Sequence, residues 1–153
     1  MFFCLHISIA QEKNYTSELG KFSMSSYGEV TKDVKQNEGN TVYRAAFRHQ
    51  EMLFAVSSTL YNVKVKKANS LLEASLSNFT KTVKGEKIAQ KRIREQKVKG
   101  VYSKLHLKKN DVQTEYKVFY KGLHLYQVMV FAKKDKYNQR SADAFFKSFK
   151  IAK

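Results

Sequence analysis

The residues best suited to do chemistry form a basic cluster between Lys81 and Lys109. This segment holds eleven lysines and arginines but only two carboxylates, those of Glu86 and Glu95. Basic side chains attract anions, and a nearby aromatic ring can stack on a base. We therefore expect an anion-binding surface, or alternatively a solvated sheet face that lysines protect from edge pairing. The candidate anion-binding residues are Lys91, Arg92, Arg94, Lys97, Lys99, Tyr102 and Lys104.

Lysine dominates the charge of the whole chain. Of 29 basic residues only five are arginines, and the net charge is +16. Lysine is a point charge that is less suited than arginine to bidentate readout of bases. This composition argues for general attraction to a polyanion or acidic protein and against dedicated nucleic-acid recognition. A lysine-rich, proline-free composition is also typical of AT-rich genomes, so the charge alone establishes no function.

The sequence contains no recognisable catalytic or metal-binding motif. It has no Gly-rich phosphate loop, no HExxH, no CxxC and no GxSxG. His106 and His124 would face each other if they lay on neighbouring strands, but two histidines alone make a weak zinc site. His49 and Glu51 are the nearest acid–base pair, and such a pair needs a pocket. We expect no enzyme, no cofactor and no metal, although a deep pocket lined by histidine and carboxylate would favour a hydrolase.

Alternating apolar and polar residues predict the strands that must carry these side chains. Before the first helix they are expected near residues 19–25, 30–36, 41–49 and 51–61. After it they are expected near 88–98, 101–107, 116–120 and 123–132, with Gly100 breaking the first two apart. The aromatic series Tyr116, Phe119, Tyr120, Tyr126 and Phe131 is interpreted as sheet packing.

Two segments have the period of an amphipathic helix. Leu72, Leu76, Phe79 and Val83 form an apolar stripe within 68–84. Asn69 or Ser70 would cap this helix and Gly85 would end it. The second helix is expected near 139–149, with Ser141 and Asp143 at its start and a buried face of Phe145, Phe146 and Phe149.

Short turns between consecutive strands favour antiparallel pairing. The order is strands, a helix, four strands and a final helix, which predicts the α+β class rather than alternating βαβ units. The length of 153 residues suits one domain, which we place at 11–153. We expect residues 17–151 to form one antiparallel β-sheet flanked by the two helices.

Three segments carry a resemblance to a known family. They are residues 17–24, with the sequence SELGKFSM; Lys99-Gly100 with the later strand 125–130; and the closing segment 142–151, ADAFFKSFKI. Together they resemble the PsbP-like sandwich domains of small exported bacterial proteins of unknown function. A proline usual after the first strand is replaced here by residues 25–28, SSYG. The resemblance implies a non-catalytic platform that binds other proteins or ligands.

Residues 1–10 resemble the end of a secretory signal peptide. They lack charged side chains, and Ser8 and Ala10 occupy the small-residue positions of a cleavage site before Gln11. The alternative is an N-terminal strand. No apolar stretch is long enough for a transmembrane helix. We therefore expect an exported, periplasmic or extracellular, binding or scaffold domain with an unknown partner, or alternatively an adaptor that binds nucleic acid or another polyanion through Lys81–Lys109.

Overall fold

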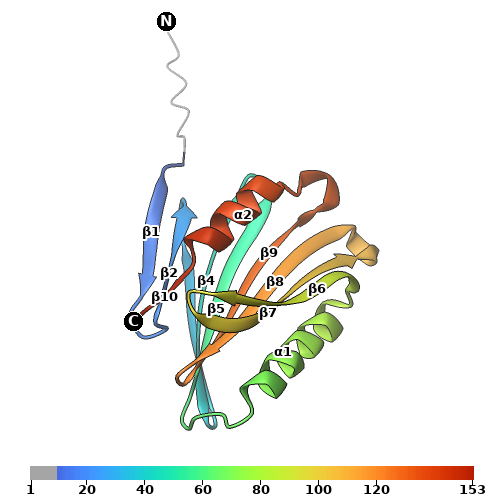
Figure 1. The fold of residues 1–153 in the computed structure, drawn as a ribbon. Coiled ribbons are helices and arrows are strands. Elements are labelled where there is room, and N and C mark those ends of the chain that lie inside the picture. The colour runs from blue at the N-terminus through green and yellow to red at the C-terminus, as the bar shows by residue number, and fades with distance from the viewer. Residues whose placement is uncertain (1–9) are drawn as a thin grey trace, which may run out of the picture.

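The computed structural model describes residues 10–153, which form ten strands, two α-helices and two short 3₁₀ helices (Figure 1). The predicted signal remnant therefore lies almost wholly outside the described residues. The first half contains β1 (Glu12–Ser17), β2 (Phe22–Tyr27), β3 (Thr31–Asn37), β4 (Asn40–His49), β5 (Met52–Tyr61) and α1 (Ala68–Val83). The second half contains β6 (Glu86–Glu95), β7 (Val98–Leu107), β8 (Val112–Lys121), β9 (His124–Lys133), α2 (Gln139–Ser148) and β10 (Lys150–Ile151), with 3₁₀ turns at Lys108–Asn110 and Lys134–Lys136.

Seven strands form one antiparallel sheet in the order β3-β4-β5-β9-β8-β7-β6. Two-residue loops join β3 to β4, β4 to β5, β6 to β7 and β8 to β9, and a 3₁₀ turn joins β7 to β8. The pairing of β5 with β9 joins the two halves of the sheet. β9 carries the most apolar run of the sequence and lies at the centre, as its composition predicts. The charged strand β6 lies at one edge, where its side chains reach water on both faces.

The prediction of one sheet is wrong, because β1, β2 and β10 form a separate three-stranded antiparallel sheet. β2 pairs with β1 on one side and, through Ser23 and Phe22, with Lys150 and Ile151 on the other. β1 has an exposed, polar sequence without an apolar alternation, and β10 has two residues. Neither therefore gives a strand signal of its own, and both are defined by pairing with β2.

The two helices lie against opposite faces of the large sheet (Figure 1). α1 buries Leu72 and Leu76 on one face, which includes Val101 and Val118. α2 and β2 cover the opposite face, with Phe145 and Phe146 in the same core as Phe119 and Val128. Adjacent residues such as Val118 and Phe119 point to opposite faces, as the pleat requires. The result is three layers: α1, the seven-stranded sheet, and α2 with the small sheet.

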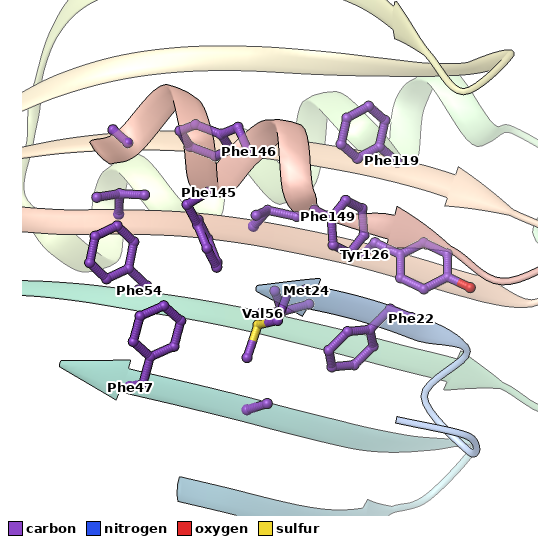
Figure 2. Close-up of a cluster of buried hydrophobic side chains, with 14 of the residues drawn as sticks. Phe22, Met24, Phe47, Phe54, Val56, Phe119, Tyr126, Phe145, Phe146 and Phe149 are labelled. Carbon is purple, nitrogen blue, oxygen red and sulfur yellow. The ribbon is translucent and has the colours of Figure 1, made fainter. Parts of the chain in front are cut away.

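Aromatic rings fill the larger core (Figure 2). Phe149 lies between the two sheets, with its ring centroid 6.3 Å from that of Phe22, 6.2 Å from Phe119 and 6.0 Å from Tyr126. At the other end of this core, Phe145 meets the stacked rings of Phe47 and Phe54 edge-on. The predicted buried face of the last helix is thus confirmed, and Phe149 contributes from just beyond the helix.

The predicted caps of α1 are wrong. Asn69 and Ser70 lie inside the helix, and Lys67 precedes it without a side-chain cap hydrogen bond. At the other end Lys84, not Gly85, adopts the left-handed conformation, with φ of 53°. Gly85 instead lies close to β7, where a Cβ would be in tight contact, 3.0 Å from Cβ of Leu105.

Gly100 does not break a strand, contrary to expectation. It lies inside β7, where a Cβ would come 2.5 Å from the carbonyl oxygen of Val118 and 2.6 Å from the Phe119 ring. The turn between β6 and β7 falls at Gln96 and Lys97, with φ of 51° and 63°. Two-residue hairpin loops need this left-handed backbone, but Asn-Gly is its usual sequence signal. Gln-Lys carries no such signal, so the turn was missed.

Candidate anion-binding site

The predicted basic residues lie on one hairpin, formed by β6 and β7 at the edge of the large sheet. Charged side chains alternate along β6: Lys91 and Glu95 line a groove beside α2, whereas Arg92 and Arg94 line a cavity beside α1. The candidate set is therefore divided between two faces. Lys91, Tyr102 and Lys104 lie toward α2; Arg92, Arg94 and Lys99 lie toward α1; Lys97 is in the turn.

The groove beside α2 has a volume of about 710 Å³ and a nearly balanced charge. We call it the α2 groove. Its charged lining consists of Lys91, Lys117, Lys147 and Lys150 with Glu95, Glu115 and Asp143. Lys117 Nζ lies 2.5 Å from Glu95 Oε1. The mixture of charges gives this groove little preference for an anion.

A buried carboxylate stands in the wall of the α2 groove. Glu115 is 3% exposed and forms no ion pair within residues 10–153. Instead it accepts three hydrogen bonds: from Tyr102 Oη at 2.8 Å, Tyr137 Oη at 2.7 Å and Gln139 Nε2 at 2.6 Å. These donors replace the water that the carboxylate loses on burial, so the network is structural.

The same network occupies Tyr102, which was expected to stack on a ligand. Its hydroxyl is held by Glu115, and Lys91 Nζ lies 5.5 Å from its ring centroid. Lys104 donates to Gln139 Oε1 at 3.2 Å and lies 6.0 Å from the Tyr137 ring. The three candidate residues on this side are thus engaged within the protein. Sequence reasoning missed Glu115, whose signal was an isolated acid in a strand of apolar and aromatic residues.

Alkaline pH is expected to destabilise the protein through its buried tyrosines. Burial and the hydrogen bond to Glu115 raise the pKa of Tyr137, and burial raises the pKa of Tyr126 to about 12. The pKa values of Tyr61, Tyr102 and Tyr116 are also raised, chiefly by burial. Unfolded tyrosine ionises near pH 10. The folded state therefore holds its phenolic protons more tightly, so the contribution of these tyrosines to stability is fully present below pH 10 and is lost as pH rises above it.

Denaturant unfolding at a series of pH values, followed by circular dichroism, measures this decline. Tyr137→Phe should make the decline shallower, because one titrating phenol is removed. An unfolding free energy that stays constant between pH 9 and about 11.5 would contradict the expectation.

The surface beside α1 differs from the α2 groove in its charge. Two adjoining cavities of about 360 and 420 Å³ share Asn69, Leu72 and Lys99. Their cations are Arg92, Arg94, Lys97, Lys99 and Lys121, and their one carboxylate is Glu73. We call these five cations the basic face. Lys121, the last residue of β8, is not in the predicted set because it lies outside the Lys81–Lys109 segment.

Four cations of the basic face are available to a partner. Arg92 donates to Glu73 Oε1 at 2.9 Å. Arg94, Lys97, Lys99 and Lys121 are exposed and form no ion pair within residues 10–153. The first turn of α1 has no acidic residue, so its backbone N–H groups add to the positive potential. The charge of this face is therefore predominantly positive.

The expected histidine pairs are not assembled. β8 separates His106 on β7 from His124 on β9. His106 contacts Asp111, and no group of three metal-ligating side chains occurs within residues 10–153. His49 stacks on Tyr27 with centroids 4.2 Å apart, whereas Glu51 pairs with Lys136 at 3.6 Å.

Ser58 contacts His124, but the direction of their hydrogen bond does not suit a nucleophile. Ser58 Oγ donates its proton to the carbonyl oxygen of Gly20 at 2.7 Å. It must then accept a hydrogen bond from His124 Nδ1, which lies 3.0 Å away. Burial, followed by the charge of Lys21, lowers the pKa of His124. A catalytic pair requires the serine to donate to the histidine, so this contact fixes β2 to the sheet rather than activating a hydroxyl.

Within residues 10–153, no helix combines the length and apolarity needed to cross a membrane. No protein-family model matches the chain. No curated protein matches it either.

A solved structure does match over nearly the whole chain. It is the solution structure of cyanobacterial PsbP (CyanoP) from Synechocystis sp. PCC 6803, with a TM-score of 0.65. The alignment covers 97% of this chain and 96% of the other at 11% sequence identity. The chain therefore has a PsbP-like fold, as its three sequence segments predicted.

Proposed function

We propose that this chain is a non-catalytic, exported binding domain whose basic face holds an anionic partner. The PsbP-like fold supports a binding platform, although a fold does not itself fix a function. The observation that carries the proposal is the contrast between the two sides of the β6–β7 hairpin. On the α2 side the cations of the strands, Lys91, Lys104 and Lys117, contact aromatic rings, an amide and a carboxylate of the protein, whereas on the other side four cations form no ion pair within residues 10–153.

The chemistry of the basic face favours a polymeric anion bound without sequence readout. Three of the four available cations are lysines, which neutralise phosphate or sulfate as point charges. The one aromatic candidate, Tyr102, lies on the other side of the hairpin and is held by Glu115. Tyr120, which is half-buried and accepts a hydrogen bond from the backbone N–H of Val65, is the aromatic residue that lines the basic face, so base stacking contributes little and the attraction is mainly electrostatic.

Removing the four available cations should weaken binding to heparin or duplex DNA and reduce its salt dependence. The variant replaces Arg94, Lys97, Lys99 and Lys121 with glutamine. If each cation neutralises one DNA phosphate, the slope of log K against log salt should become shallower by about 3 to 4. Affinity should not depend on the DNA sequence. Fluorescence anisotropy at several salt concentrations measures both quantities.

The chain offers a matched control with the same change in net charge. Lys91, Lys104, Lys147 and Lys150, on the α2 side, are replaced with glutamine in a second variant. This variant should retain most of the affinity and the slope. Equal losses in the two variants would show that net charge alone determines the binding, and the basic face would then be a solvated surface.

Export is proposed from the charge-free start of the sequence and the small residues at Ser8 and Ala10. Cleavage would leave Gln11 as the first residue, directly before β1. Intact-mass measurement and N-terminal sequencing of the protein from its native host test this. Recovery of the protein with Met1 or Phe2 still at its N-terminus would contradict export by this route.

A further inference from the structure

A second cavity lies where the ends of the two sheets meet the first turns of α2. It has a volume of about 260 Å³ and receives side chains from β1, β2, β4, β5 and α2. We call it the aromatic pocket. Its lining consists of Glu12, Ser25, Tyr27, Phe47, His49, Gln50, Phe54, Arg140, Ser141, Ala144 and Phe145. It shares no residue with the basic face or the α2 groove.

The walls of the aromatic pocket are rings held by one another. Phe47 and Phe54 stack with centroids 4.9 Å apart and an interplanar angle of 11°. Phe145 meets them edge-on at 5.8 and 5.1 Å (Figure 2). Tyr27 and His49 form a second stacked pair at 4.2 Å and 12°. Phe47, Phe54 and Phe145 are at most 4% exposed, so they form the rigid base of the pocket, and the partly exposed Tyr27–His49 pair provides its accessible aromatic surface.

Arg140 gives the pocket an anion-binding group. It lies in the first turn of α2, is exposed, and forms no ion pair within residues 10–153. The planar guanidinium matches a carboxylate with two parallel hydrogen bonds. Ser25, Ser141 and Gln50 add hydrogen-bonding groups to the lining. The only carboxylate there is Glu12, which is exposed at the start of β1.

We propose that the aromatic pocket binds a small planar aromatic carboxylate. The ring would lie against the phenylalanine and Tyr27–His49 walls, and the carboxylate would pair with Arg140. The size of the pocket limits the ring system: a cavity of about 150 Å³ holds benzene, and drug-sized ligands need about 300 Å³ or more. At about 260 Å³, the pocket suits one ring or two fused rings. This site is independent of the basic face and of the anionic polymer proposed for it.

Indole-3-acetate is a suitable probe because the chain contains no tryptophan. Indole fluorescence, excited beyond tyrosine absorption, therefore reports the probe alone. Titration of the full chain should give saturable binding with a Kd on the order of 0.1–1 mM. The uncharged indole-3-acetamide should bind about tenfold more weakly, because it cannot form a charge-assisted pair with Arg140.

Two variants and one control locate the binding. Arg140→Gln should weaken indole-3-acetate binding about tenfold and leave indole-3-acetamide unchanged. Ala144→Leu should abolish binding of both probes, since it adds bulk to the pocket lining at a helix position that accepts leucine. Lys147→Gln is the control: it removes one charge from the same helix but lines the α2 groove.

Circular dichroism confirms that each variant is folded before titration. The absence of saturable binding would overturn the proposal, as would equal binding of the acid and the amide. Equal weakening by Arg140→Gln and Lys147→Gln would overturn it as well, by showing that net charge alone attracts the probe. Neither the pocket variants nor the control alters a residue of the basic face, so failure here leaves the polyanion proposal standing.

Discussion

Replacing Glu115 with alanine is expected to lower the free energy of unfolding by about 3–5 kcal/mol. The substitution removes the shared acceptor of Tyr102, Tyr137 and Gln139. Tyr102 and Tyr137 are half-buried, and a buried donor left without an acceptor costs about 1–3 kcal/mol, whereas the exposed Gln139 can turn to water. The loss should be measurable as a lower midpoint of urea unfolding with an unchanged m-value.

Glu95→Ala is the matched control for this prediction. Glu95 lines the same groove and pairs with Lys117, but its side chain is 35% exposed. Removing a partly exposed pair should cost about 1 kcal/mol or less. Similar losses for the two variants would show that Glu115 is not the centre of the network. Retention of full stability by Glu115→Ala would show that the three donors find other acceptors.

Replacing Phe149 with alanine is expected to cost about 3–5 kcal/mol. Phe149 is 2% exposed and touches Phe22 of the small sheet together with Phe119 and Tyr126 of the large one. Its removal leaves a cavity between the sheets that neither sheet can close alone. Because Phe149 joins the two sheets, the substitution should also speed hydrogen exchange at the backbone amides of β2, relative to the parent protein, more than at those of β9.

Phe131→Ala serves as a comparison on the opposite face of the large sheet. Phe131 is half-buried, with its ring centroid 6.0 Å from that of Phe79, so its loss should cost less and leave exchange in β2 unaltered. Phe149→Leu, which keeps most of the volume, should cost less than about 1.5 kcal/mol. If Phe149→Ala unfolds at the same urea concentration as the parent chain, the ring does not hold the sheets together.

The order of the elements could be predicted because the longer ones have strong periodicity. Leu72, Leu76 and Phe79 identify α1, and the apolar run of β9 identifies the centre of the sheet. The small sheet could not be found in the same way. Residues 12–17 are polar and exposed, and β10 is two residues long, so both depend on partners distant in the sequence.

The candidate site was predicted in part. The seven candidate residues could be grouped from the sequence because they are close together in it, and they lie on one hairpin. The division of the cluster between two faces depends on the turn at Gln96 and Lys97, and this turn contains no glycine or asparagine that would predict it. Lys121 joins the basic face only through the fold, because β8 carries it there from outside the charged segment.

The position of β2 between β1 and β10 has a consequence for the order of folding. β1 and β2 can pair as soon as residues 12–27 are available, but the other edge of β2 must wait for Lys150 and Ile151. The backbone N–H of Ala152 then donates to the carbonyl oxygen of Lys21 at 2.9 Å, so almost the entire chain forms one closed loop. Closing so long a loop is entropically costly and slow. The small sheet is therefore completed last, and a nascent or truncated chain lacking its final residues leaves the backbone edge of β2 unpaired and open to pairing with other chains.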